Sequence, residues 1–164
     1  MSEQTIEKNQ SSTSELGGRY LSFNLGETFY AVTVSRVREI IRTMDVTRVP
    51  RTPAFIRGVM NLRGKIVPVL TLRTILGMES VEDTDDSRVI VIEVGSAEVG
   101  VTVDSVREVA TIKDEEIGDP PEFGEQIKTE FVLGMGTVGG EVTILLDFDR
   151  ALESTLASPV VRPA

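Results

Sequence analysis

The chain of 164 residues contains no cysteine and no histidine. Without cysteine it can form no disulfide, no thiolate metal site and no cysteine nucleophile. Without histidine it lacks the base of the Ser-His-Asp triad, the usual ligand of zinc sites and the side chain that shuttles protons near neutral pH. These two absences exclude most enzyme classes, and we expect no catalytic residue, no metal site and no cofactor.

Tryptophan is also absent, and aromatic residues make up only 5% of the chain. So few aromatic side chains speak against a surface that stacks on nucleic-acid bases. No apolar run approaches the roughly 18 residues that a membrane-spanning helix needs, and the N-terminus shows no signal-peptide pattern. We expect a cytoplasmic protein with no nucleic-acid partner and no direct insertion into a membrane.

The net charge of −9 is unevenly divided along the chain. Residues 19–76 carry ten Lys and Arg, nine of them Arg, against three Asp and Glu, whereas residues 77–164 carry six against twenty. Two differently solvated faces would explain this division. The predominance of arginine favours a second explanation, because its planar fork pairs with carboxylates in a bidentate geometry. An acidic protein partner is therefore favoured over nucleic acid.

One sequence pattern occurs twice. The segment Tyr30–Ile40 returns at Val99–Val109 with a constant offset, and Val-Thr-Val-x-x-Val-Arg-Glu recurs in it unchanged. The segment Phe55–Leu70 returns at Phe131–Leu146 with a larger offset, so the second copy contains a longer internal loop. Two copies predict two similar structural units.

Short β-branched runs at regular spacing predict an all-β fold with few short helices. We expect two five-stranded barrels in tandem, one over about residues 19–80 and one over about 87–152. The expected strands are Tyr20–Leu25, Thr28–Val34, Val37–Thr43, Phe55–Leu62, Lys65–Thr71, Arg88–Val94, Glu98–Val103, Val106–Ile112, Phe131–Val138 and Glu141–Asp147. Short helices are expected at Leu72–Leu76 and Asp149–Leu156.

The remaining segments are polar or acidic. Residues 1–18 are expected to form a disordered tail, residues 81–86 an acidic linker, and residues 153–164 a flexible C-terminal tail.

The period-2 alternation of the repeated segments predicts which side chains are buried. The segment Val34–Ile41 also fits helical spacing, with a helical turn before a strand, but its repetition between strand-like runs favours a strand. We expect Val32, Val34, Val101 and Val103 to face the core and Thr33 and Thr102 to face outward.

A hairpin tip differs between the two copies. The first copy, Asn61–Lys65, has the sequence Asn-Leu-Arg-Gly-Lys. The second copy, Thr137–Glu141, keeps a glycine (Gly140) at the position of Gly64 but contains no Asn, Arg or Lys. The turn therefore does not require these polar residues, which favours a function for Arg63. Glu39 on a neighbouring strand is the carboxylate that Arg63 is expected to meet.

The repeat, the Val-Arg-Glu-Ile after the second strand and the string Thr52-Pro53-Ala54-Phe55-Ile56-Arg57-Gly58 through Asn61-Leu62-Arg63-Gly64 resemble the CheW-type chemotaxis coupling proteins. The resemblance covers about residues 19–152 and leaves out the linker and both tails. It implies two interlocked SH3-like five-stranded barrels around a hydrophobic seam. It also implies a non-catalytic adaptor that is recruited to membrane receptor arrays. There it would link the cytoplasmic tips of chemoreceptors (methyl-accepting chemotaxis proteins) to the regulatory domain of a CheA-type histidine kinase.

The resemblance assigns two groups of binding residues, and it implies that the seam receives a receptor helix hairpin in an apolar groove. The implied receptor-binding residues are Arg63, Glu39, Val37, Gly58 and Val109. The implied kinase-binding residues, on the loop Met44–Val49 and the nearby hairpin, are Met44, Val46, Arg48 and Arg57.

Other functions remain open from the sequence. The chain could be a coupling protein or a scavenger of a non-motility chemosensory array. From another class, it could be a hydrolase that uses carboxylates alone. Asp147 and Asp149 resemble a pair of acids, but without a nucleophile or a base partner we expect them to be strand-end and helix N-cap charges. A nucleic-acid binder with an SH3-like or OB-like barrel rests only on the basic first half.

Overall fold

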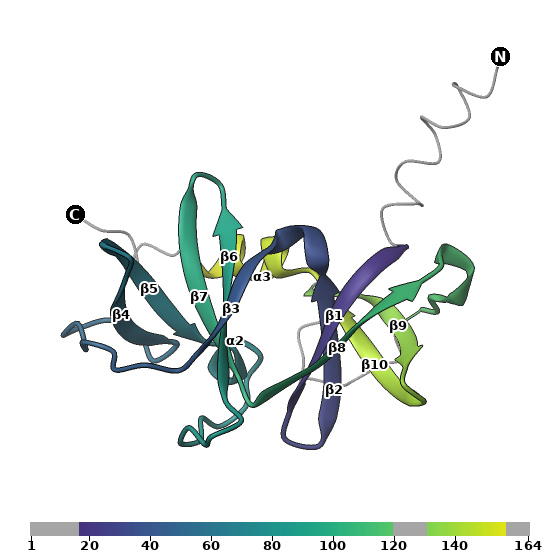
Figure 1. Cartoon of the computed structure of the whole chain (residues 1–164), viewed down its shortest axis with the longest axis horizontal. Coiled ribbons are helices and arrows are strands. Elements are labelled where there is room, and N and C mark those ends of the chain that lie inside the picture. The colour runs from purple at the N-terminus through teal and green to yellow at the C-terminus, as the bar shows by residue number, and fades with distance from the viewer. Residues whose placement is uncertain (1–16, 120–130, 157–164) are drawn as a thin grey trace, which may run out of the picture.

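The computed structural model describes residues 17–119 and 131–156, with side chains up to residue 153. These residues form two five-stranded sheets with two short α-helices between them (Figure 1), which confirms the predicted all-β class. The strands are β1 (Gly18–Leu25), β2 (Thr28–Thr33), β3 (Val37–Arg42), β4 (Ile56–Leu62), β5 (Lys65–Thr71), β6 (Arg88–Val94), β7 (Ala97–Val103), β8 (Ser105–Ile112), β9 (Val132–Val138) and β10 (Glu141–Leu146). The helices are α2 (Leu72–Ile75), α3 (Phe148–Leu156) and the 3-10 turns η1 (Val34–Arg36) and η2 (Asp114–Glu116).

The ordered part is slightly longer than predicted. Strand β1 begins at Gly18, one residue before the predicted start of the domain. Helix α3 continues to Leu156, four residues beyond the predicted end of the domain at residue 152. The rest of the two predicted tails lies outside the described residues.

The two sheets do not follow the order of the two repeats. Barrel A has the strand order β8-β1-β2-β10-β9, and barrel B has the order β3-β6-β7-β5-β4. Each barrel therefore combines the first two strands of one repeat with the last three strands of the other. The division into a barrel of residues 19–80 and a barrel of residues 87–152 is wrong, and the interlocked arrangement is the one observed.

The exchange is symmetric in its residue pairing. In barrel A, β2 and β10 are parallel and place Ala31 beside Leu145. In barrel B, β7 and β5 are parallel and place Gly100 beside Val69. By the offsets found in the sequence, Gly100 is equivalent to Ala31, and Leu145 is equivalent to Val69. The same two positions of the repeat therefore lie side by side in both barrels. Each half thus packs on the other around an approximate twofold relation.

Each barrel is closed by a short backbone bridge between its first and last strands. After β3, Thr47 exchanges two hydrogen bonds of 2.8 and 2.9 Å with Val59 of β4. After η2, Gly118 exchanges two hydrogen bonds of 2.9 Å with Met135 of β9. These bridges cover backbone groups at strand edges, which are otherwise free to pair with another chain.

The predicted alternation is partly confirmed. Val32, Val101 and Val103 are buried, and Thr33 is half-buried. Val34 is only half-buried, because the chain leaves β2 in the 3-10 turn η1, so a helical turn precedes β3. Thr102 is buried rather than outward, because its hydroxyl donates a hydrogen bond of 3.3 Å to the Leu70 carbonyl across the parallel strands.

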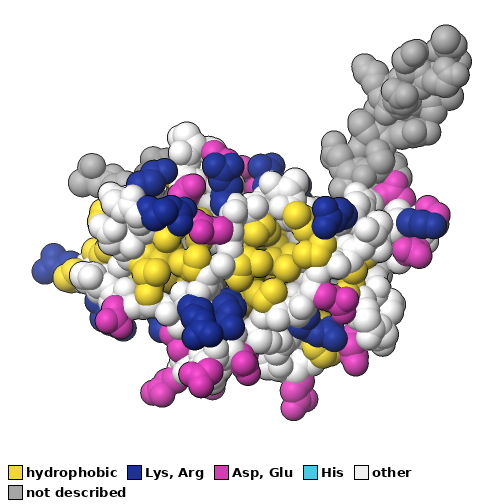
Figure 2. All heavy atoms as spheres, in the orientation of Figure 1, with side chains coloured by type: hydrophobic (Ala, Val, Ile, Leu, Met, Phe, Trp, Pro, Cys, Tyr) yellow, Lys and Arg dark blue, Asp and Glu magenta, His cyan; other side chains and the backbone are white. Residues whose placement is uncertain are grey.

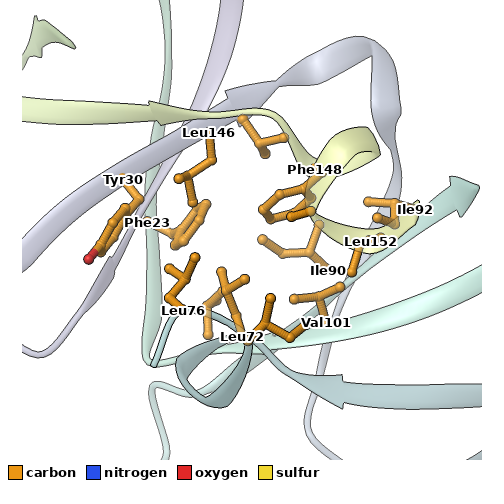
Figure 3. Close-up of a cluster of buried hydrophobic side chains, with 14 of the residues drawn as sticks. Phe23, Tyr30, Leu72, Leu76, Ile90, Ile92, Val101, Leu146, Phe148 and Leu152 are labelled. Atoms are coloured by element: carbon orange, nitrogen blue, oxygen red, sulfur yellow. The ribbon is translucent and has the colours of Figure 1, made fainter. Parts of the chain in front are cut away.

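The largest apolar cluster lies between the barrels, which each have a smaller core of their own. Figure 3 shows side chains from both repeats pointing toward one another there, among them Phe23, Ile90 and Phe148. Burying one such side chain is worth roughly 1.5–3 kcal/mol. The seam is therefore a filled core. Docking of a helix hairpin at the seam, as the resemblance implies, would therefore take place on its outer surface and not between these side chains.

Two ion pairs flank the seam with opposite polarity. On one side, Arg73 of α2 donates two hydrogen bonds, of 3.1 and 2.6 Å, to Asp104 between β7 and β8. On the other side, Asp149 of α3 pairs at 2.5 Å with Arg36 of η1. Arg73 and Asp149 occupy equivalent positions in the two repeats, so the charges of the two pairs are exchanged.

The Asp104 carboxylate also accepts a hydrogen bond of 2.7 Å from the Gly26 backbone N–H. Partial burial by itself raises the pKa of Asp104. The hydrogen bonds from Arg73 and Gly26 outweigh this effect and hold the pKa below its ordinary value.

We expect Asp104→Asn to lower the free energy of unfolding by about 1–2 kcal/mol at pH 7, because an amide loses the charged part of both interactions. A carboxyl whose pKa is lowered by folding stabilises the native state fully above its unfolded pKa of about 3.9. That contribution is lost as the pH falls through the lower folded value. The free energies of unfolding of Asp104→Asn and of the wild-type protein, measured by urea titration, should therefore become more similar as the pH falls below about 4. The exposed Asp86→Asn is the control, and a difference independent of pH would contradict this role of Asp104.

Candidate functional site

The recurring Val-Arg-Glu segment forms a β-bulge in both repeats. In β3, Val37 pairs with Ile92 and Glu39 with Val91, so one extra residue, Arg38, stands between them. Strand β8 has a register shift against β1 at the equivalent place. A bulge bends a strand and changes the direction of its side chains. The repetition of Val-Arg-Glu is therefore explained by local structure.

Glu39 and Arg63 meet as the sequence predicted. Both terminal nitrogens of Arg63 donate hydrogen bonds to the two carboxylate oxygens of Glu39, from the β4–β5 hairpin to the bulge of β3. The hydrogen bond from Arg63 holds the pKa of Glu39 below its ordinary value. The guanidinium remains exposed, so a partner can still reach it.

The backbone at Arg63 is unusual for a residue with a side chain. Its φ is +51°, in the left-handed region that favours glycine, and the equivalent Gly139 at the β9–β10 tip has φ +60°. Both tips have the same turn, yet only one contains arginine. Residues held in this region despite its cost are frequent at functional sites. The geometry strengthens the case that Arg63 is present for its side chain.

Val37 and Val109 do not lie on the same sheet. Val37 is half-buried on β3 of barrel B, whereas Val109 is 44% exposed on β8 of barrel A. Sequence reasoning missed Ile40, which is the equivalent of Val109 in the first repeat and is 40% exposed. The constant offset between the repeated segments could have identified it. Figure 2 shows a band of hydrophobic side chains across this face, over the region where Figure 1 draws β3, β1 and β8.

Gly58 is a buried residue and not an exposed contact. A Cβ atom at this position would lie 2.3 Å from the Thr47 carbonyl oxygen and 2.5 Å from Val46, and its φ is +150°. The equivalent Gly134 is packed in the same way, because its Cβ would lie 2.8 Å from the Gly118 carbonyl oxygen. Both glycines allow the backbone bridge that closes each barrel. Gly58 therefore allows the close approach of Val46 and Thr47 to β4.

The four residues of the second group come together. Met44, Val46, Arg48 and Arg57 all line one hollow of about 370 Å³ at the barrel B end of the molecule. Arg57 donates hydrogen bonds of 2.9 and 2.6 Å to Asp83 of the acidic linker. The linker thus folds back onto the arginine-rich surface, which its composition did not predict.

Asp147 and Asp149 have structural partners, as expected from the sequence. Asp147 accepts a hydrogen bond of 3.0 Å from the Arg150 N–H in the first turn of α3, and Asp149 pairs with Arg36. Within residues 17–119 and 131–156, no three acidic side chains cluster so as to hold a metal ion. In the same part of the chain, no helix is long and apolar enough to cross a bilayer.

Two closed barrels, exposed arginines and carboxylates engaged in structural contacts define a protein-binding module. Residues 19–156 match the family model of the CheW-like domain. The chemotaxis protein CheW of Klebsiella aerogenes is 38% identical over 139 residues, which are 85% of this chain and 84% of that protein. Protein FrzA of Myxococcus xanthus is 32% identical over 145 residues, 87% of this chain and 90% of that protein.

Among solved structures, the crystal structure of the scaffolding protein TtCheW from Thermoanaerobacter tengcongensis is similar, with a TM-score of 0.74 at 32% identity. The match covers 82% of this chain and 87% of that one. The chain belongs to the CheW family. It is a scaffold and coupling adaptor of chemotaxis and not an enzyme, and the hydrolase alternative has no support.

We expect Gly58→Ala to lower the free energy of unfolding by at least about 2 kcal/mol, because the new methyl group forces the Thr47 backbone away. Gly64→Ala is the matched control, since Gly64 also has a positive φ, of +87°, but a Cβ there meets nothing within 4 Å. The control should cost only the backbone strain, about 1 kcal/mol. Equal stability of the two variants in urea titrations would contradict the structural role of Gly58.

Proposed function

We propose that this protein holds the cytoplasmic tips of chemoreceptors to the regulatory domain of a CheA-type histidine kinase, in the cytoplasm at membrane receptor arrays. The proposal is supported by its family and by two sets of surface residues, one confined to barrel B and one that also includes Val109 of barrel A. The receptor surface contains Arg63, Glu39 and Val37, together with the exposed apolar side chains of Val109 and Ile40. The kinase surface contains Met44, Val46, Arg48 and Arg57.

The Arg63–Glu39 pair is the observation that carries this proposal. The turn accepts glycine at the equivalent position of the other repeat, so the fold does not need the arginine. Its fork is oriented by Glu39 before any partner arrives. A guanidinium held in this way loses less freedom on meeting a partner carboxylate, which favours a polar contact at the edge of an apolar interface.

The apolar residues complete the receptor surface. Val109 and Ile40 are exposed on the two bulged strands, β8 and β3. The seam beneath is filled, so the receptor would lie across the surface without penetrating it. Such a shallow interface needs both an apolar contact and a polar contact that fixes its orientation.

We expect Arg63→Gly to keep the fold and lose the coupling. The variant has the residue found at position 139, so it should melt at or slightly above the temperature of the wild-type protein. In a reconstituted assay with receptor and kinase, receptor-dependent kinase activation should fall by at least about tenfold, because a matched charge is lost from the interface.

Arg150→Gln is the control, since it removes one charge from an exposed position on α3 that belongs to neither proposed surface. It should keep wild-type activation. Normal activation by Arg63→Gly would contradict the role of Arg63, and low activation by both variants would indicate a general effect of charge.

A further inference from the structure

Arg48 stands at the junction of several hollows on the barrel B end. It lines the hollow of about 370 Å³ beside the loop after β3 and a neighbouring one of about 270 Å³ next to the linker. Arg57 and Asp83 also line both of these hollows. A third hollow follows the chain from Arg48 to Ile56. The three hollows thus share Arg48, and two of them also share Arg57.

Two arginines of this region, Arg48 and Arg51, have no partner among the described residues. Among the described residues, Arg48 makes no hydrogen bond and no ion pair, and the same is true of Arg51 on the turn that follows. Arg51 is exposed and has φ +66° after Pro50, at a turn position that favours glycine. Within residues 17–119 and 131–156, the two non-glycine residues with positive φ are Arg51 and Arg63. Both turns thus present an arginine side chain at the cost of backbone strain.

Arg57 is a third arginine that the fold does not require. Its equivalent in the second repeat is Leu133, on β9. Its partner Asp83 belongs to the linker, which lies outside the two repeated segments. The Arg57 and Asp83 side chains are 33% and 28% exposed, so water and another carboxylate can compete for this pair. The pair shows which chemical group the Arg57 fork accepts.

The surroundings favour a short acidic peptide over a long polyanion. The whole chain carries a net charge of −9, and Asp45, Glu82 and Asp83 line the hollows. A nucleic acid would meet these carboxylates along its length. A peptide with two or three carboxylates matches the separate arginine forks, which bind such groups in a bidentate geometry.

We propose that the hollows around Arg48, Arg51 and Arg57 bind an acidic peptide segment of the partner, and that Asp83 occupies the Arg57 end of this site until the segment replaces it. This inference rests on the proposed function, because it specifies the chemistry of the kinase-facing surface. The linker then acts as an internal competitor, which lowers the affinity for weakly acidic segments and is displaced by strongly acidic ones.

The test uses a fluorescein-labelled hexaglutamate peptide and the full chain, followed by fluorescence anisotropy at low salt. We expect saturable binding that weakens as salt is added. Arg48→Gln, Arg51→Gly and Arg57→Gln should each weaken binding by at least about fivefold, whereas Asp83→Asn should strengthen it by about threefold or more. Arg51→Gly also relieves its turn, so it should be no less stable than the wild-type protein.

Arg19→Gln is the matched control, because Arg19 is exposed on β1 of barrel A and makes no ion pair among the described residues. It should change the affinity by less than about twofold, the small effect expected of a distant surface charge. An equal loss in Arg19→Gln would overturn the site, as would tighter binding of a hexathymidylate of similar charge. An unchanged or weaker affinity in Asp83→Asn would overturn the competition by the linker.

A parallel capture of purified CheA-type kinase by the same variants separates this inference from the proposed function. If the kinase is captured and the peptide does not bind, the acidic-peptide site is wrong and the proposed function stands. If the peptide binds with the expected variant pattern and the kinase is not captured, the site stands and the proposed partner is wrong. Arg48→Gln decides the result should Arg57→Gln fail to fold, since Arg48 has no internal partner to lose.

Discussion

The shared core between the barrels is the constraint on which the rest of the structure depends. Each barrel has a small apolar core of its own, but the largest cluster takes side chains from both barrels and both α-helices. Because β1 and β2 leave their own repeat to join β8, β9 and β10, neither barrel can form from one repeat alone. The two units therefore fold as one domain, and their outer surfaces are held in a fixed relation.

The exchanged ion pairs explain how two similar halves pair with each other and not with themselves. Arg73 of the first repeat faces Asp104 of the second, and Asp149 of the second faces Arg36 of the first. In a pairing of two first repeats, Arg73 would face Ser35, the equivalent of Asp104, and would lose its carboxylate. In a pairing of two second repeats, Asp149 would face Ser105, the equivalent of Arg36, and would lose its guanidinium. A partly buried charge without its partner is costly, so the exchange favours the mixed arrangement.

The strands and the Arg63–Glu39 pair could be predicted from the sequence, because local patterns determine them. Alternation and β-branching identify the strands, and the repeat identifies Arg63 as an exception to its own turn. The exchange of strands could not be read from pattern or spacing, because the same alternation is satisfied whether a repeat closes on itself or on its neighbour. The burial of Thr102 depends on a hydrogen bond to Leu70 of the other repeat, and the Arg57–Asp83 pair depends on how the linker folds back. Such contacts are set by tertiary structure.

Comparison of the two halves separates what the fold needs from what binding adds. Gly58 and Gly134 recur because the closing bridges leave no room for a side chain, and Val-Arg-Glu recurs because both edge strands bulge. Arg63 and Arg57 do not recur, since Gly139 and Leu133 hold the same backbone without them. The arginines lie at positions where the fold permits a choice. A duplicated scaffold can therefore change its partners at these positions in one half while the other half and the shared core keep the structure intact.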